Sequence, residues 1–245
     1  MNSHRIAGQA REFEFFDEII LFSEYDITDF VNKHRSFIES NRHGYGCWIW
    51  KPKIIHDTLL KMNDNDILVY CDAGIYLNIN GKSRFLEYIE MLSDVDMITF
   101  STNDFYKAIK YVGIDAIMEY YPNLLNESDI NSCYAGVMII KKTSKTLNFI
   151  NDWLELCNNY DYLLGKLSMK YTIQDQYVGN DSDCGLFNLC LAKYKISKNI
   201  YPDECNVYTE DGLQTVHAGI NPKNTDWSKL NDKPFQIRRI TPKFY

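Results

Sequence analysis

Charged side chains that could bind a ligand stand beside several apolar segments of the chain. Asp72 follows the apolar run Ile-Leu-Val-Tyr at 67–70, and Gly74 comes two positions later. In an open α/β sheet, ligands bind beyond the carboxyl ends of the strands. An aspartate on a glycine-containing loop at this point is therefore a candidate ligand-binding residue. The alternative is an aspartate that only stabilises the turn.

A second group precedes this strand, in the sequence HGYGCWIWKP at 43–52. Pro52 suits the first turn of a helix, and the spacing of apolar residues predicts a helix to about residue 62. Lys51, at its start, would face a phosphate or a sugar, helped by the helix N-terminus. The alternative is a surface lysine that lies over Trp48. We expect one of Trp48 and Trp50 in the wall of a site and the other in the core.

Two later segments carry further candidates. Asp183 lies in NDSDCGLF at 180–187, before a predicted helix. Its carboxylate could orient or deprotonate a hydroxyl, or it could simply cap the helix. His217 lies in VHAGINPK at 216–223, which ends at Lys223. Imidazole is a good ligand for transition metals, although a lone histidine before a glycine turn is usually structural.

The blocks at 43–52 and 70–74 (YCDAG) resemble small nucleotide-sugar-dependent glycosyltransferases of GT-A type. Those proteins, from bacterial polysaccharide clusters and large DNA viruses, carry a block like RGYGYWIWKP, a helix, and a strand that ends in YxDAG. The resemblance continues weakly through 134–136, the helix around Trp153, and 180–187. The segment at 216–223 is similar to the HxG…K element of glycogenin-like and bacterial galactosyltransferases.

The resemblance implies transfer of a sugar from a nucleoside-diphosphate donor, with UDP expected, to a glycan or protein-linked acceptor. It implies Mn²⁺ or Mg²⁺ bound by Asp72 and His217, and catalytic roles for Asp72 and Asp183. The residues that it implies for donor binding are Tyr45, Trp48, Lys51, Asp72, Gly74 and Lys223. A base at Asp183 favours inversion and the HxG element favours retention, so both outcomes stay open.

Three departures from the family pattern keep other functions in view. The second acid of a D-x-D motif is absent after Asp72, and most residues of 180–187 differ from the family segment. GT-A domains also open with a strand, whereas this sequence begins inside the helix that follows it, so the strand is missing or replaced. These departures favour a GT-A-fold nucleotide-sugar-binding or scaffold protein without turnover. A sugar nucleotidyltransferase ranks last, because it needs a glycine-rich basic loop that the sequence lacks.

Composition narrows the class of protein. The chain has 245 residues, of which 45% are hydrophobic and 24% charged, as expected of one soluble globular domain over 1–245. A net charge of −7 argues against nucleic acid as the partner. Neither a membrane span nor a signal peptide is expected from the apolar runs. Seven cysteines without a close CxxC pair predict reduced thiols and a cytoplasmic location.

The apolar periodicity predicts helices that alternate with strands. A mostly parallel central sheet flanked by helices, in a single GT-A-like α/β domain, is therefore expected. Helices are predicted at 5–11, 28–39, 52–62, 85–92, 108–120, 143–157 and 185–193, and strands at 15–22, 67–70, 96–100, 134–140 and 215–219. The run at 67–70 is expected to be a central strand that is covered on both faces.

Overall fold

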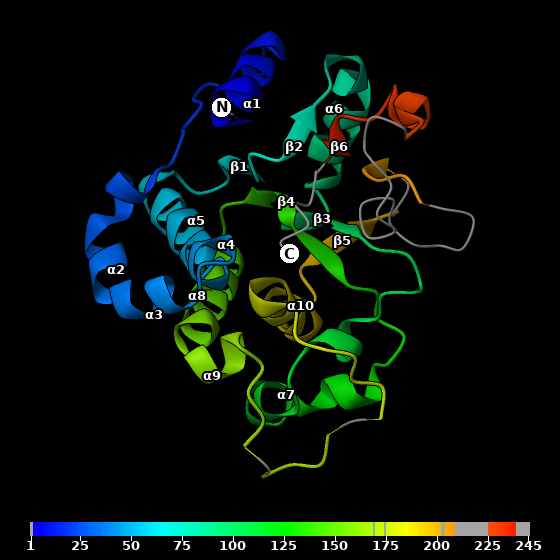
Figure 1. Cartoon of the computed structure of the whole chain (residues 1–245). Coiled ribbons are helices and arrows are strands. Elements are labelled where there is room, and N and C mark those ends of the chain that lie inside the picture. Colours follow the sequence, from blue (N-terminus) through cyan, green and yellow to red (C-terminus); the bar gives the residue numbers. More distant parts are fainter. Residues whose placement is uncertain (1, 169, 174, 202–203, 209–224, 239–245) are drawn as a thin grey trace.

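The computed structural model describes residues 2–238 except 169, 174, 202–203 and 209–224 (Figure 1). The predicted strand at 215–219 lies outside these residues. The strands are β1 (Ile67–Cys71), β2 (Ile75–Leu77), β3 (Met97–Ser101), β4 (Cys133–Lys141), β5 (Ser197–Ile200) and β6 (Phe235–Ile237). The helices are α1 (Asn2–Glu12), α2 (Thr28–Lys33), α3 (Arg35–Ser40), α4 (Gly44–Cys47), α5 (Trp50–Lys61), α6 (Lys82–Met91), α7 (Ile114–Tyr120), α8 (Ser144–Asn158), α9 (Tyr160–Leu163) and α10 (Ser182–Tyr194).

The main sheet has the strand order β1-β4-β3-β5. β4 is antiparallel to both β1 and β3, and β3 is parallel to β5. The α/β class is thus confirmed, with a mixed sheet in which three strands share one direction and β4 runs against them. β1 is an edge strand among the described residues, so the expectation of a central strand is wrong. Its side chains are accordingly only partly covered.

Side chains of the central strands alternate between two cores, as the period of a strand requires. Met138 and Ile140 of β4 belong to the core under α5, α8 and α10, whereas Val137 and Ile139 belong to the core under α6. Figure 1 shows these two sets of helices on opposite sides of the sheet. β2 pairs with β6 as a separate antiparallel ribbon that covers the second core.

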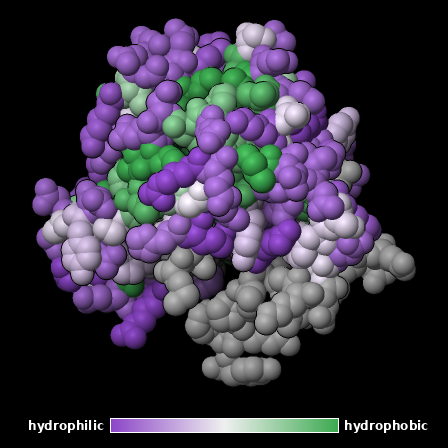
Figure 2. Space-filling model, turned by 90° about the horizontal axis from the view of Figure 1, so that it is seen from above, coloured by the Kyte–Doolittle hydropathy of each residue, from purple (hydrophilic) through white to green (hydrophobic). Residues whose placement is uncertain are grey.

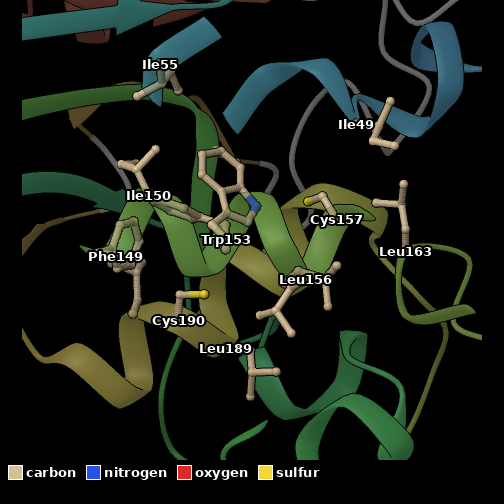
Figure 3. Close-up of a cluster of buried hydrophobic side chains, with 14 of the residues drawn as sticks. Ile49, Ile55, Phe149, Ile150, Trp153, Leu156, Cys157, Leu163, Leu189 and Cys190 are labelled. Atoms are coloured by element: carbon tan, nitrogen blue, oxygen red, sulfur yellow. The ribbon is translucent and has the colours of Figure 1, made fainter. Parts of the chain in front are cut away.

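α8 forms the centre of the first core. The side chain of Thr143 accepts a hydrogen bond from the Thr146 amide, 3.2 Å away, which confirms the predicted start of this helix. Trp153, from the middle of α8, is fully buried. Figure 3 shows its ring surrounded by apolar side chains of α5, α8 and α10. Trp153 of α8 therefore packs between α5 and α10, the two helices that carry charged residues of the site described below.

The predicted strand at 15–22 is wrong. Its residues form an exposed connection between α1 and the turn before α2, without strand pairing. Phe13 and Phe16 pack around Phe85, which holds this end of the connection through side chains rather than through a backbone ladder. Figure 2, viewed from the α1 end, shows apolar patches between polar ones. Exposed apolar residues of the connection are Phe15, Ile20, Leu21 and Phe22.

Two expectations about sequence chemistry can be compared directly with the fold. All seven cysteines are free thiols. Their apolar sequence surroundings predict Cys71, Cys133, Cys157 and Cys190 in the core, and the last three are buried whereas Cys71 is only partly buried. In the part of the chain that the structure describes, every helix is too short or too polar to cross a bilayer.

Candidate functional site

The site begins at a left-handed turn that precedes α5. Five consecutive residues, 44–48, have positive φ angles between 54° and 84°. Outside glycine, this conformation costs about 1–2 kcal/mol for each residue. Such strain persists where surrounding contacts enforce it, and it clusters at functional sites. Here the indole of Trp50 donates to the Gly44 carbonyl oxygen at 3.0 Å, and the Gly46 amide donates to the Asn41 carbonyl oxygen at 2.8 Å.

The two glycines of this turn are needed for close packing as well as for their φ angles. A Cβ atom added to Gly44 would lie 2.4 Å from the Trp48 ring, and one added to Gly46 would lie 2.8 Å from the Ile38 side chain. The motif GYG thus allows the chain to turn tightly against α3 and then enter α5. The turn delivers Lys51 into the first turn of α5, below the surface.

Lys51 makes contacts that a surface lysine would not make. It is only 3% exposed, and its Nζ atom lies 2.8 Å from Oδ2 of Asp183 and 3.7 Å from Oδ1 of Asp72. The Trp48 ring centroid is 5.8 Å away. The 2.8 Å contact with Asp183 is a buried ion pair, because both side chains are almost completely covered. The alternative of a lysine spread over Trp48 at the surface is therefore wrong.

Asp72 follows the last residue of β1, where its backbone fixes the loop. Its amide donates to the Gly136 carbonyl oxygen of β4 at 2.8 Å, and its own carbonyl oxygen accepts from the Ile75 amide at 2.9 Å. The side chain is 11% exposed, and its Oδ1 accepts a hydrogen bond from the Tyr70 hydroxyl at 2.7 Å. Asp72 is thus the more accessible carboxylate of the pair that Lys51 contacts.

Asp183 enters the site from the first turn of α10. Asp181 occupies the N-cap position, and the Asp183 carboxylate is directed to Lys51, so Asp183 does not cap the helix. Burial raises the pKa of this carboxyl from 3.8 to about 6, although the Lys51 ammonium opposes the rise. The Trp153 indole donates to the Asp183 carbonyl oxygen at 2.9 Å. α8 therefore positions the backbone from which this carboxylate projects.

Together these contacts form one connected group, Tyr70–Asp72–Lys51–Asp183, which we name the acid–lysine cluster. It joins the start of α5, the end of β1 and the start of α10. Carboxylates accept hydrogen bonds from hydroxyl groups, and a carboxyl group with a pKa near neutrality can take up or release a proton at physiological pH. The cluster is therefore suited to bind and orient a polyhydroxylated molecule.

Of the remaining predicted site residues, three lie in the part of the chain that the structure describes and two do not. Tyr45 is 44% exposed in the left-handed turn, Trp48 lies beside Lys51, and Gly74 lies in the loop after Asp72. Trp50, in contrast, is half-buried and packs against the edge of the first core. His217 and Lys223 lie outside the described residues.

Four residues of this region had no role assigned from the sequence. Tyr70 precedes Asp72 by two positions on a strand, and this period places both side chains on one side. Trp153 gives no sequence signal of its contact with α10. Cys47 and Ser182, both with positive φ, are hydrogen-bond partners between the two turns. Their pairing joins residues far apart in the chain, which a single sequence does not show.

Comparisons with protein-family models, curated proteins and solved structures gave no match to this chain.

Proposed function

We propose that the chain is a nucleotide-sugar-dependent glycosyltransferase of GT-A type that binds its sugar substrate at the acid–lysine cluster. One observation carries the proposal. Lys51, Asp72 and Asp183 belong to three separate sequence motifs. In the fold, one carboxylate oxygen of Asp72 and one of Asp183 lie within 3.7 Å of the Lys51 ammonium. Residues that serve only their own local turns would have no reason to converge in this way.

The roles follow from burial. Asp72, the partly exposed carboxylate, contacts the hydroxyls of the incoming sugar. Asp183, with its raised pKa, accepts a proton from the acceptor hydroxyl as that oxygen attacks the anomeric carbon of the sugar. The bond from this carbon to the diphosphate oxygen breaks, and the nucleoside diphosphate leaves with its electron pair. Lys51 holds both carboxylates in place, and the aromatic rings of Tyr45 and Trp48 supply flat apolar surface for a sugar or a base.

A panel of nucleoside diphosphates and their sugars tests the proposal by thermal unfolding. A ligand at ~100 times its dissociation constant stabilises a fold by about 2.7 kcal/mol, so one nucleotide family is expected to raise Tm clearly. Release of the nucleoside diphosphate from the sugar donor is then measured for the wild type and Asp183→Asn. Loss of release in the variant, with donor binding kept, supports the assigned base. If no nucleotide raises Tm, the proposal is wrong.

A binding protein without turnover is the second candidate. The observation that favours it is the single acid at the end of β1, because Ala73 and Gly74 follow Asp72 where the family's D-x-D would supply another carboxylate. This candidate predicts the same stabilisation by nucleotide sugars, but no release of nucleoside diphosphate by the wild type with any acceptor tried. The release measurement therefore separates the two candidates.

A further inference from the structure

The resemblance to GT-A enzymes implies a divalent cation bound by Asp72 and His217, of which His217 lies outside the described residues. The acid–lysine cluster permits a test of whether Asp72 and Asp183 together fit such an ion. Mg²⁺ and Mn²⁺ prefer about six oxygen ligands, and Mg²⁺ takes them at about 2.0–2.1 Å. Any such ion between Asp72 and Asp183 would use their carboxylate oxygens. Among the described residues, no group of three or more histidine, cysteine, aspartate or glutamate side chains is arranged to hold a metal.

The space between the two carboxylates already contains a cation. Lys51 Nζ lies 2.8 Å from Asp183 Oδ2 and 3.7 Å from Asp72 Oδ1. A divalent ion bound to both oxygens would lie close to this ammonium in a region where Lys51 and Asp183 are each at most 3% exposed. Like charges repel most strongly where water is excluded. The residues present therefore do not fit a divalent ion between the carboxylates.

Lys51 is also held so that it cannot easily leave. It follows Ile49, which is fully buried, and lies in the first turn of α5 directly after the left-handed turn at 44–48. The Lys51 amide donates to the Trp48 carbonyl oxygen at 2.9 Å. Movement of the ammonium out of the cluster would leave Asp183 buried without its counter-charge, which is strongly unfavourable.

We infer that Lys51 is the resident cation of the Asp72–Asp183 pair, so that this pair binds no divalent metal and its contacts with a sugar nucleotide are independent of Mn²⁺ and Mg²⁺. The statement about nucleotides rests on the proposed function, whereas the statement about metal binding stands without it. The carboxylates, neutralised in part by the ammonium, remain available to accept hydrogen bonds from sugar hydroxyls.

Titration with Mn²⁺, followed by the electron paramagnetic resonance signal of the free ion, tests the metal-binding statement. The wild type is compared with Lys51→Gln and Asp72→Asn, each checked for folding by circular dichroism. We expect weak binding to the wild type, unchanged in Asp72→Asn, and at least tenfold tighter binding to Lys51→Gln, in which the competing charge is gone. One tight Mn²⁺ site in the wild type that Asp72→Asn removes would overturn the inference.

The second arm needs no variant that is at risk of misfolding. The dissociation constant of the best nucleotide from the panel is measured on the wild type in EDTA and in Mn²⁺. Values within about twofold of each other support the inference, and a gain of tenfold or more with Mn²⁺ contradicts it. If nucleotides bind under neither condition, the proposed function fails, and the Mn²⁺ titration alone decides whether Lys51 excludes the metal.

Discussion

Two buried carboxylates of this fold have similar surroundings and opposite protonation behaviour. Glu204 receives both Nη2 and Nε of Arg84, at 2.7 and 3.2 Å, and the Tyr88 hydroxyl at 2.6 Å. Burial alone would raise its pKa, but these partners outweigh burial and the pKa lies below 4.5. Asp183 has Lys51 as its cation, and there burial wins and raises the pKa to about 6.

The two ion pairs differ in how completely the carboxylate charge is compensated. The pair of Glu204 joins two elements of the fold, whereas the pair of Asp183 leaves a carboxyl group that can exchange a proton near neutral pH. The Arg84–Glu204 pair joins α6 to the segment after β5, and its charges are well compensated. Asp183 is held by a single ammonium that it shares with Asp72. Carboxyl groups kept incompletely compensated inside a protein are enriched at functional sites. The contrast therefore supports assigning the acid–lysine cluster to function and Glu204 to structure.

Removal of the Lys51 charge is expected to have the largest effect on stability. Lys51→Met leaves the buried Asp183 without its cation, which should lower the free energy of unfolding by about 3–5 kcal/mol. Urea denaturation at pH 7 measures this loss. The double variant Lys51→Met/Asp183→Leu removes both charges and should recover most of it. A loss below about 1 kcal/mol in the single variant would mean that the pair is not the tight contact described above.

The pH dependence of stability should have opposite signs at the two carboxylates. Between pH 4 and 6, folded Asp183 keeps a proton that the unfolded chain has released, so its contribution is complete below about pH 4 and falls as the pH rises through 6. The rise in pKa from 3.8 to about 6 corresponds to a loss on the order of 3 kcal/mol. Glu204, with a lowered pKa, contributes above pH 4.5 and loses its contribution in acid.

Denaturation curves at several pH values for the wild type, Asp183→Asn and Glu204→Gln measure both signs. From pH 4 to 6, the free energy of unfolding of the wild type should fall relative to that of Asp183→Asn. As the pH falls below 4.5, the free energy of unfolding of the wild type should fall relative to that of Glu204→Gln. Parallel curves for the wild type and Asp183→Asn would contradict the raised pKa.

Loss of the Glu204 charge should have a smaller effect than loss of Lys51. Glu204→Gln weakens hydrogen bonds to a charged partner, a change of about 2 kcal/mol, and the Arg84 side chain is 25% exposed and can turn to water. Urea denaturation at pH 7 measures the loss. Nucleotide affinity should be unchanged in this variant, and a tenfold weaker affinity would contradict its structural assignment.

The smallest expected effect concerns the orientation of Asp72. Tyr70→Phe removes the hydroxyl that donates to Asp72 Oδ1 at 2.7 Å, a change of about 1 kcal/mol, or roughly fivefold in nucleotide affinity. Calorimetric titration of the wild type and the variant checks this value. An unchanged affinity would show that the Tyr70 hydroxyl does not position Asp72 for ligand binding.

Local patterns predicted much of this fold. The helix after Pro52, the strand before Asp72 and the capped helix from Thr143 all lie within a few residues of their expected positions. Each of these rests on periodicity, turn residues or caps, which act over one or two turns. Lys51, Asp72 and Asp183 are each singled out by a sequence motif, and the fold brings their charged groups together.

The predictions that are wrong, and the contacts that were not predicted, concern features that depend on residues far apart in the chain. The segment 15–22 has the composition of a strand, but no strand lies beside it in the described residues. The edge position of β1 follows from sheet order, which its own apolar sequence does not encode. The Arg84–Glu204 pair joins residues far apart in the chain. The ion pair between Lys51 and Asp183, which excludes both alternative interpretations of these residues, has the same origin.

Calorimetric titration of the best nucleotide sugar into the wild type, Asp72→Asn and Glu204→Gln tests the assignment of the acid–lysine cluster most directly. Asp72→Asn keeps the shape of the side chain and changes the charge of the more accessible carboxylate, and Glu204→Gln makes the same change at the structural pair. The account predicts equal affinity for the wild type and Glu204→Gln, and at least tenfold weaker affinity for Asp72→Asn. Equal affinity in all three proteins would place the sugar-nucleotide site elsewhere and contradict the account.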